Sequence, residues 1–191
     1  MSIYTREELQ GLGLAGVGED VRISRRASIY GASRIVIGDH VRIDDFCVLS
    51  AGEGGIEIGS YIHIAVYSSL IGAGRIAIHD FANISSRVSI YSSSDDYSGE
   101  TMTNPMVPDE YKRVDHAPVV IGRHVIVGSG SIVLPGVTLH EGVAVGALSL
   151  VSRDVDPFTI CAGVPAKPIK SRSRSLLDHE RAFMAKQASS Q

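Results

Sequence analysis

The stretch IVIGDHVRIDDFCVL, residues 35–49, places branched aliphatic residues at Ile37, Ile43 and Leu49, six positions apart. A second apolar series runs two positions earlier, and both series return in IEIGSYIHIAVYSSL (56–70) and IAIHDFANISSRVSI (76–90). The C-terminal half continues the period with Ile121, Val127, Val133, Leu139, Val145 and Val151. A helix repeats every 3.6 residues and a strand every two, so neither predicts a strict period of six.

A coil of three short strands does predict this period, with one hexapeptide on each side of a triangular prism. The inward residues of successive coils then stack and fill a narrow core. Glycine follows the aliphatic residue at Gly38, Gly59 and Gly122, where the Cβ atom of another residue would clash at a tight corner. We therefore expect an all-β fold, a parallel β-helix of hexapeptide repeats.

Four insertions interrupt the period, and all of them fall at the same corner of the predicted prism. They lie between Ile29 and Ile37, Leu49 and Ile58, Leu70 and Ile78, and Ile90 and Ile121. The last pair is 31 positions apart instead of six, and the excursion opens with IYSSSDDYSGETMTNP (90–105). Repeat proteins often carry insertions on the face that binds ligands. The long loop therefore indicates where the active site lies.

The whole chain, residues 1–191, is expected to form one domain. The β-helix is expected over about 21–160, with the loop excursion over 91–120. A short N-terminal helix is predicted over 4–13, with glycine at its end. A short packed helix is predicted over 174–188, where these residues fall at close to helical spacing: Leu176, Leu177, His179, Phe183 and Met184.

Composition excludes several classes of function. The net charge of −3 and the lack of a basic run argue against nucleic acid or an anionic membrane as the main partner. The N-terminus has no apolar signal core, and no segment approaches the ~18 apolar residues of a membrane span, so a cytoplasmic protein without membrane insertion is expected. Cys47 and Cys161 lie far apart and indicate neither a disulfide framework nor a zinc site.

The stretch VVIGRHVIVGSGSIVLPGVTLHEGVAVGALSLVSRDV (119–155), followed by CAGVPAKPIKSR (161–172), resembles the left-handed β-helix hexapeptide acyltransferases. Within them it looks nearest to the galactoside, maltose and xenobiotic O-acetyltransferases. The resemblance covers about residues 35–172. It implies a left-handed coil, acetyl-CoA as acyl donor, and a homotrimer with active sites in the clefts between subunits. It also implies acetylation of a sugar hydroxyl, in surface polysaccharide biosynthesis.

The same resemblance places the donor along small and basic residues of the last coils. The matching positions are Ser129, Ala147, Ser152, Arg153, Lys167 and Lys170. Small residues permit the close approach of the pantetheine arm, and lysine or arginine side chains can bind the phosphates of the nucleotide. The fold also carries γ-class carbonic anhydrases, whose zinc is held by histidines that include an H-x4-H pair. No such pair occurs in this sequence, so no metal is expected.

Acyl transfer to a hydroxyl needs a base that accepts its proton. In the O-acetyltransferases this base is a histidine in a pattern like I-Y-T-G-S-H-D, just before the large loop. The matching stretch here is IYSSSDD (90–96), and Asp95 stands in the place of the histidine. His116, which closes the loop, is a weaker candidate for this role.

Three hypotheses remain open. In the first, Asp95 is the base, and partial burial with the neighbouring Asp96 makes it a better proton acceptor. In the second, His63 of an adjacent subunit is the base and Asp95 orients its imidazole. In the third, the acceptor is an amino sugar that attacks as the neutral amine, and Asp95 binds its ammonium form. The third makes N-acetylation of a nucleotide-linked amino sugar an alternative function. A non-catalytic β-helix scaffold is a further alternative.

Overall fold

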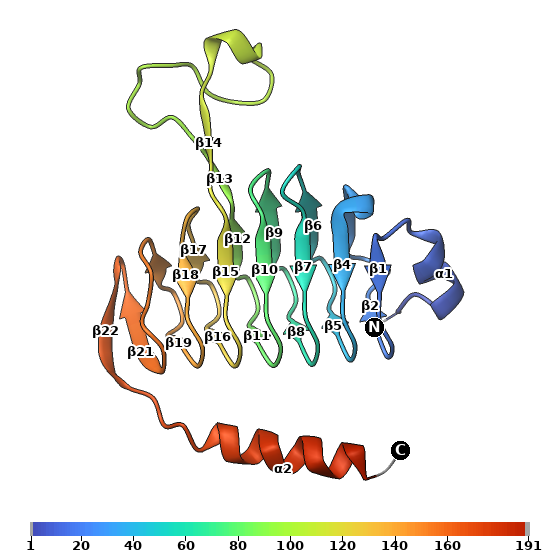
Figure 1. The fold of residues 1–191 in the computed structure, drawn as a ribbon. Coiled ribbons are helices and arrows are strands. Elements are labelled where there is room, and N and C mark those ends of the chain that lie inside the picture. The colour runs from blue at the N-terminus through green and yellow to red at the C-terminus, as the bar shows by residue number, and fades with distance from the viewer. Residues whose placement is uncertain (1, 190–191) are drawn as a thin grey trace.

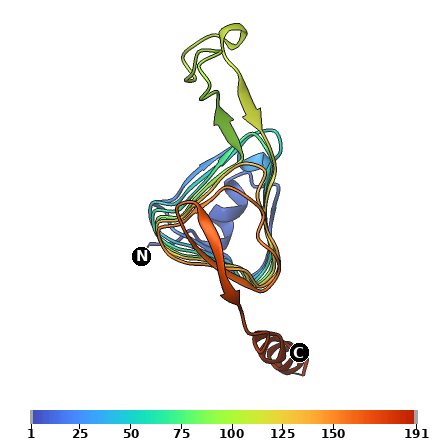
Figure 2. The same ribbon diagram turned by 90° about the vertical axis from the view of Figure 1, so that its left-hand side faces the viewer.

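The computed structural model describes residues 2–189. In this range the chain winds into a triangular prism of six coils, each with one short strand per side, followed by the hairpin β21–β22 (Figure 1 and Figure 2). The predicted parallel β-helix is confirmed. Its coils begin at residue 16, somewhat before the predicted start at 21.

Each side of the prism is a parallel sheet made of one strand from every coil. Sheet 1 contains β1 (Gly16–Val17), β4 (Ile35–Ile37), β7 (Ile56–Ile58), β10 (Ile76–Ile78), β15 (Val119–Ile121) and β18 (Thr138–Leu139). Sheet 2 contains β2 (Arg22–Ile23), β5 (Arg42–Ile43), β8 (His63–Ile64), β11 (Asn83–Ile84), β16 (Ile126–Val127), β19 (Ala144–Val145), β21 (Thr159–Gly163) and the antiparallel β22 (Ala166–Ser171). Sheet 3 contains β3 (Ser28–Tyr30), β6 (Val48–Ala51), β9 (Ser69–Gly72), β12 (Ser89–Tyr91), β17 (Ile132–Val133) and β20 (Leu150–Val151).

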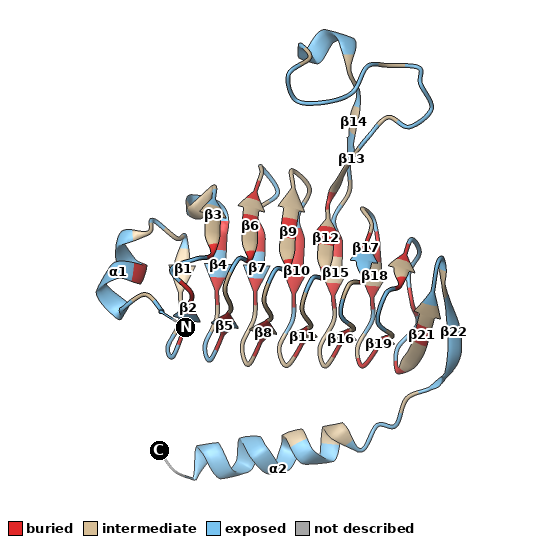
Figure 3. Ribbon diagram, turned by 180° about the vertical axis from the view of Figure 1, so that it is seen from behind, coloured by how far each residue is buried: buried red, intermediate tan, exposed pale blue. Residues whose placement is uncertain are grey.

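The register of the sheets follows the six-residue series. On sheet 1 the stacked partners are Ile37, Ile58, Ile78, Ile121 and Leu139. These five side chains are almost completely buried, as are the inward residues two positions earlier in each strand (Figure 3). Burying one such side chain contributes roughly 1.5–3 kcal/mol, so the repeated column supplies a continuous core.

The predicted clash at the glycine corners is confirmed, and its cause is the next coil. A Cβ atom at Gly38 would lie 2.8 Å from the carbonyl carbon of Gly59, so the two backbones approach too closely for a side chain. Gly38 and Gly59 do not have positive φ. That conformation is adopted instead by larger residues two or three positions further on, for example Tyr61 (φ 59°) and Phe81 (φ 62°). Positive φ directs these side chains outward at the corners.

The three corners differ, and each is named here by its content. The loop corner, between sheets 3 and 1, holds all four insertions, including the 3-10 helix η1 (Ala32–Arg34). The helix corner, between sheets 1 and 2, carries His40, Tyr61, Phe81 and His124 in one column. The arginine corner, between sheets 2 and 3, carries Arg26, Phe46, Tyr67 and Arg87 in another.

The long loop leaves the loop corner after β12 and projects away from the prism (Figure 1 and Figure 2). It is not irregular throughout, because its root is the antiparallel pair β13 (Ser93–Asp95) and β14 (Val114–His116). A second 3-10 helix, η2 (Asp109–Tyr111), lies in its outer part. The sequence predicted a polar excursion at this place but not the hairpin that holds it.

The predicted helices are present at the two ends. Helix α1 (Arg6–Gly11) begins with a capping box between Thr5 and Glu8, and its Leu9 is buried against the first coil. Helix α2 (Leu176–Ala188) runs back alongside the prism on the side away from the long loop (Figure 1). Helix α2 has no buried residue, so the expected packing of its apolar side chains is only partial. Phe183 contacts Tyr61 and Phe81 edge-on, and Glu180 binds Arg123 and His124.

Candidate active site

A cavity of about 420 Å³ lies at the root of the long loop. Its walls are Tyr91, Ser93, Ser94, Asp95, Tyr97, Ile132, Leu134, Pro135 and Leu150. The loop supplies the polar side and the outer face of sheet 3 supplies the apolar side. Asp95, the sequence-predicted candidate for the base, therefore borders a cavity that combines a carboxylate with aliphatic walls.

Asp95 and Asp96 have different environments although they are adjacent. Asp95 is exposed, and its carboxylate has no hydrogen-bond partner among residues 2–189. Asp96 accepts hydrogen bonds from the hydroxyl and backbone N–H groups of both Ser98 and Thr101, at 2.6–3.0 Å. These bonds hold the pKa of Asp96 well below its usual range, and those from Ser98 contribute most. Asp96 therefore shapes the loop, and a single chain does not provide the burial of Asp95 that the first hypothesis requires.

His116 serves the hairpin at the loop root. The backbone N–H of Ala73 donates to Ser93 Oγ at 2.7 Å, and Ser93 Oγ lies 2.8 Å from His116 Nδ1. This chain of contacts joins the two strands of the hairpin to the neighbouring coil. His116 also lines a separate, open cavity beside Arg34 and Glu53 rather than the one beside Asp95.

His63 lies on the outer face of sheet 2, as the sequence predicts, but its carboxylate partner within the chain is Asp44. His63 Nε2 is 2.8 Å from Asp44 Oδ2, and Arg42 Nε donates to Asp44 Oδ1 at 2.7 Å. Burial raises the pKa of Asp44, but the hydrogen bonds from His63 and Arg42 outweigh it and leave that pKa below its usual value. One chain does not bring His63 to Asp95, because the width of sheet 3 separates them.

The predicted donor residues fall into two groups. Ser129 and Ala147 lie at the arginine corner on successive coils, and Lys167 and Lys170 are exposed on β22 beyond them. Ser152 and Arg153 follow β20 at the loop corner and are also exposed. None of the three basic residues has an ion-pair partner in the described part of the chain.

A strip of small residues follows the arginine corner from the last coils toward the coil of β10–β12. Its members are Ser85, Ser86, Gly128, Ser129, Gly146 and Ala147. Neighbouring coils touch here: the hydroxyls of Ser86 and Ser129 lie 3.3 Å apart, and a Cβ atom at Gly128 would lie 2.5 Å from the nitrogen of Ala147. The strip spans three coil steps up to β21, or about 14 Å at ~4.8 Å per step.

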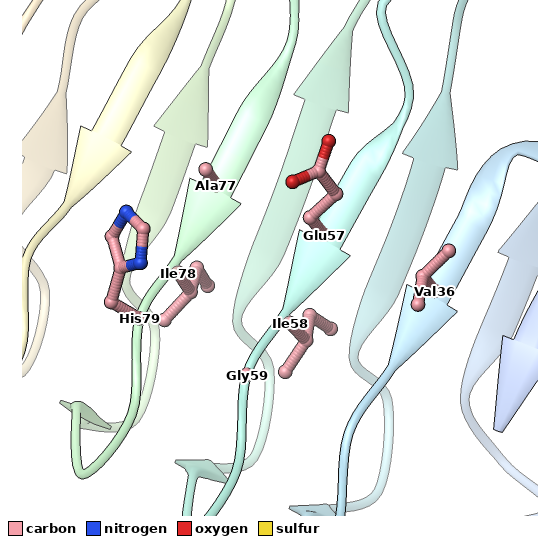
Figure 4. A pocket seen from close by; sticks show the side chains of 7 residues that line it. All are labelled: Val36, Glu57, Ile58, Gly59, Ala77, Ile78 and His79. Carbon is pink, nitrogen blue, oxygen red and sulfur yellow. The ribbon is translucent and has the colours of Figure 1, made fainter. Parts of the chain in front are cut away.

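A further cavity, of about 350 Å³, lies on sheet 1 and is lined by Val36, Glu57, Ile58, Gly59, Ala77, Ile78 and His79 (Figure 4). Its carboxylate is engaged, because Arg75 Nε donates to Glu57 at 2.8 Å and lowers the pKa of Glu57. None of its residues belongs to the predicted site. Between residues 2 and 189 no group of three or more His, Cys, Asp or Glu side chains could hold a metal ion. In the same range no helix combines the length and apolar character needed to cross a bilayer.

Comparison with known proteins gives matches over nearly the whole chain to two acyltransferases. A protein of Escherichia coli named dTDP-4-amino-4,6-dideoxy-D-glucose acyltransferase is 60% identical over 183 residues, which cover 96% of this chain and 95% of its own length. The structure of AntD, an N-acyltransferase from Bacillus cereus, with dTDP and 3-hydroxybutyryl-CoA has a TM-score of 0.93 and 46% identity, and covers 98% of both chains. No family model matches the sequence.

The predicted placement nearest the galactoside, maltose and xenobiotic O-acetyltransferases is wrong. A chloramphenicol acetyltransferase of Agrobacterium fabrum is 34% identical, but only over 112 residues, or about half of each chain.

Proposed function

The chain belongs to the hexapeptide-repeat β-helix acyltransferases, and we propose that it transfers an acyl group from coenzyme A to the amino nitrogen of dTDP-4-amino-4,6-dideoxyglucose. This is the N-acylation that the sequence offered as an alternative to sugar O-acetylation. Two observations support it: the names of the two long matches, and an exposed carboxylate where O-acetyltransferases use histidine. A product still linked to dTDP would be activated for glycosyl transfer, so the role in surface polysaccharide synthesis stays a prediction.

An amine explains why a carboxylate suffices. A hydroxyl must lose its proton as it attacks, whereas a neutral amine attacks through its lone pair and loses a proton afterwards. In the proposed reaction the nitrogen bonds to the thioester carbonyl carbon, the C–S bond breaks, and the thiolate of coenzyme A leaves. The proton of the resulting N–H⁺ group passes to the carboxylate of Asp95, which then returns it to solvent or to the thiolate. The products are the amide and coenzyme A.

Ser85 joins Asp95 as a candidate, although sequence reasoning missed it. The AntD structures include variants of one serine and of one aspartate ten positions further along that protein. Ser85 and Asp95 are also ten positions apart. Ser85 lies at the end of the small-residue strip, where a thioester carried along that strip would arrive.

A second copy of the chain is needed to unite these residues. Ser85 precedes β12 at the arginine corner and Asp95 follows it beyond the loop corner, so sheet 3 separates them. The outer face of sheet 3 bears no charged side chain in its strands. The first residue of each strand on this face is Ser28, Val48, Ser69, Ser89, Ile132 or Leu150. A flat, uncharged face suits a symmetric contact. We infer a homotrimer in which Asp95 of one subunit reaches the strip of the next, and in which His63 remains a weaker alternative base.

On the donor side, we propose that coenzyme A lies along the small-residue strip. Ser129 and Ala147 would contact its pantetheine arm, and Lys167 and Lys170 its phosphates. Ser152 and Arg153 lie at the other corner of the last coil, so they would reach the same coenzyme only from a neighbouring subunit. Acetyl-CoA is the proposed donor, and 3-hydroxybutyryl-CoA, seen bound to AntD, is the comparison to test.

The test follows thiol release with acetyl-CoA or 3-hydroxybutyryl-CoA and dTDP-4-amino-4,6-dideoxyglucose. Asp95→Asn should lower kcat/KM by ~10²-fold or more, the usual contribution of a general base. Asp109→Asn, in the same loop but 96% exposed and paired only with Lys112, should retain activity. The analogue with a hydroxyl in place of the amine should be a poor acceptor. Equal rates with that analogue would overturn N-acylation, and an unaffected Asp95→Asn would exclude Asp95 as the base.

A further inference from the structure

The arginine corner carries an exposed ladder of two rings between two guanidinium groups. The rings of Phe46 and Tyr67 are stacked, with centroids 4.9 Å apart and planes 11° from parallel. The guanidinium of Arg26 lies 5.6 Å from the centroid of Phe46, and that of Arg87 lies 5.3 Å from the centroid of Tyr67. Phe46 and Tyr67 remain 43% and 51% exposed, which is unusual for aromatic side chains that only stabilise a fold.

Arg87 differs from most other cations of the chain in having no acidic partner among residues 2–189. Arg26, at the other end of the ladder, is paired with Asp45 at 3.5 Å. Arg34 and Arg172 donate to backbone carbonyl groups. The remaining described cations without an ion pair are Arg153, Lys167, Lys170 and Arg174, all in the C-terminal part, where the coenzyme phosphates are proposed to bind. Among the described cations of the coils before the long loop, only Arg34 and Arg87 have no ion pair. Arg34 donates to backbone carbonyl groups, and Arg87 does not.

The position of Arg87 relates it to the reaction centre. It follows Ser85 by two residues at the same corner, where the small-residue strip ends. The strip reaches Ser85 from the C-terminal coils. A donor bound along the strip would therefore occupy that side of Ser85, and the surface on the other side, toward Tyr67 and Phe46, would remain free for the acceptor. An acceptor linked to a nucleoside diphosphate brings two negative charges and a nucleobase to this side.

We propose that Arg87 binds the diphosphate of the nucleotide-sugar acceptor, and that the exposed edges of Tyr67 and Phe46 contact its nucleobase. This inference rests on the proposed function. Guanidinium–phosphate hydrogen bonds are charge-assisted and directional. Stacking on Tyr67 holds the guanidinium in place before the ligand arrives, which reduces the entropy lost on binding. The two anionic substrates would thus be recognised by two separate groups of cations.

The experiment measures dTDP binding by calorimetry and steady-state kinetics for the wild-type enzyme and three variants. Arg87→Gln should weaken dTDP binding and raise the KM for the acceptor by about tenfold to a hundredfold, as for the loss of a hydrogen bond between charged groups. The KM for acetyl-CoA should not change. Arg87→Lys should recover part of the loss because the charge remains. The control is Arg75→Gln, which removes an arginine of the same coil that is paired with Glu57 on sheet 1.

The outcomes separate this inference from the proposed function. If the wild-type enzyme does not bind dTDP at all, the proposed function fails and the inference fails with it. If the wild-type enzyme binds dTDP and Arg87→Gln binds it equally well, only the inference is overturned. A change in the KM for acetyl-CoA alone would place Arg87 in the donor site. Dissociation of the oligomer by Arg87→Gln, measured by sedimentation, would make it an interface residue. Both of these results also overturn the inference.

Discussion

Two corners of the prism carry columns of stacked rings, and they differ in what covers them. At the helix corner Tyr61 and Phe81 stack with centroids 4.9 Å apart, and at the arginine corner Phe46 and Tyr67 stack at the same distance. The spacing follows from the separation of neighbouring coils, ~4.8 Å, and from the positive φ that points each ring outward. Stacking is therefore a product of the coil itself and does not reveal a function.

The surroundings of the two columns make the difference. At the helix corner Phe183 of α2 lies edge-on against both rings, and Glu180 binds His124, whose side chain is only 10% exposed. At the arginine corner no other element of residues 2–189 covers the rings, and Arg87 has no acidic partner. The covered column stabilises the chain, and the open column is left for a ligand.

The largest effect should come from removing one ring from each column, Phe81 at the helix corner and Tyr67 at the arginine corner. Phe81→Ala deletes contacts with Tyr61, His124 and Phe183 and should reduce the free energy of unfolding by about 2–3 kcal/mol. This is less than the ~3–5 kcal/mol of fully buried Phe→Ala changes, because Phe81 is only half-buried. Tyr67→Ala should cost less than ~1 kcal/mol, since its ring is half exposed. Urea unfolding followed by circular dichroism, at equal protein concentrations, measures both. Equal losses of unfolding free energy in the two variants would mean that both columns stabilise the fold to the same extent.

A smaller effect should follow from releasing α2 from the helix corner. Glu180→Gln weakens the contacts with Arg123 and His124 and should cost about 1–2 kcal/mol, since Glu180 is 14% exposed and is hydrogen-bonded to the guanidinium group of Arg123. Asp178→Asn, on the same helix but paired only with the exposed Arg181, should change stability by less than ~0.5 kcal/mol. The same unfolding measurement applies. If both variants behave alike, α2 is not held by this contact.

The smallest effect concerns two aspartates that each bind a histidine, Asp20 at the helix corner and Asp44 at the arginine corner. The pKa of Asp44 in the folded chain is below the unfolded value of ~3.9. Its stabilisation is therefore complete above that value and is lost as the pH falls through the folded-state pKa. Asp44→Asn should cost less than ~1 kcal/mol at neutral pH and nothing in strong acid.

Asp20→Asn is the matched comparison for this titration. Hydrogen bonds from His40 and then Arg22 lower the pKa of Asp20 in the same direction, but Asp20 is 45% exposed. The difference in unfolding midpoint between the wild type and Asp20→Asn should therefore depend less on pH than the difference between the wild type and Asp44→Asn. A difference between wild type and Asp44→Asn that does not shrink on acidification would contradict the sign derived from these contacts.

Most of the fold could be predicted because one periodicity carries it. The inward position of Ile37, Ile58 and Ile78 follows from counting in sixes, and the four insertions share a corner as expected. The columns at the corners were not predicted, although their signal was present. Tyr61 and Phe81 occupy the same phase of the repeat, and aligning the coils residue by residue would have placed them beside His40 and His124.

The candidate site was predicted less completely, for physical reasons. The alignment to a histidine motif predicts Asp95 as the base, because such an alignment depends only on local order along the chain. The alignment could not identify Asp44 as the partner of His63. That contact joins side chains of two neighbouring coils, and both side chains are polar residues that could equally face solvent. The alignment also did not single out Ser85, a small residue next to another serine, because the proposed role of Ser85 depends on a neighbouring subunit.

The two ends of the prism have a consequence beyond the site. A stack of parallel coils exposes unpaired backbone N–H and C=O groups at its first and last strands, and such edges can add further strands from other molecules. Here α1 covers the first coil with Leu9, while β22 turns back antiparallel on β21 and ends the parallel series. Covering both ends in this way acts against the end-to-end growth of coils into a fibre.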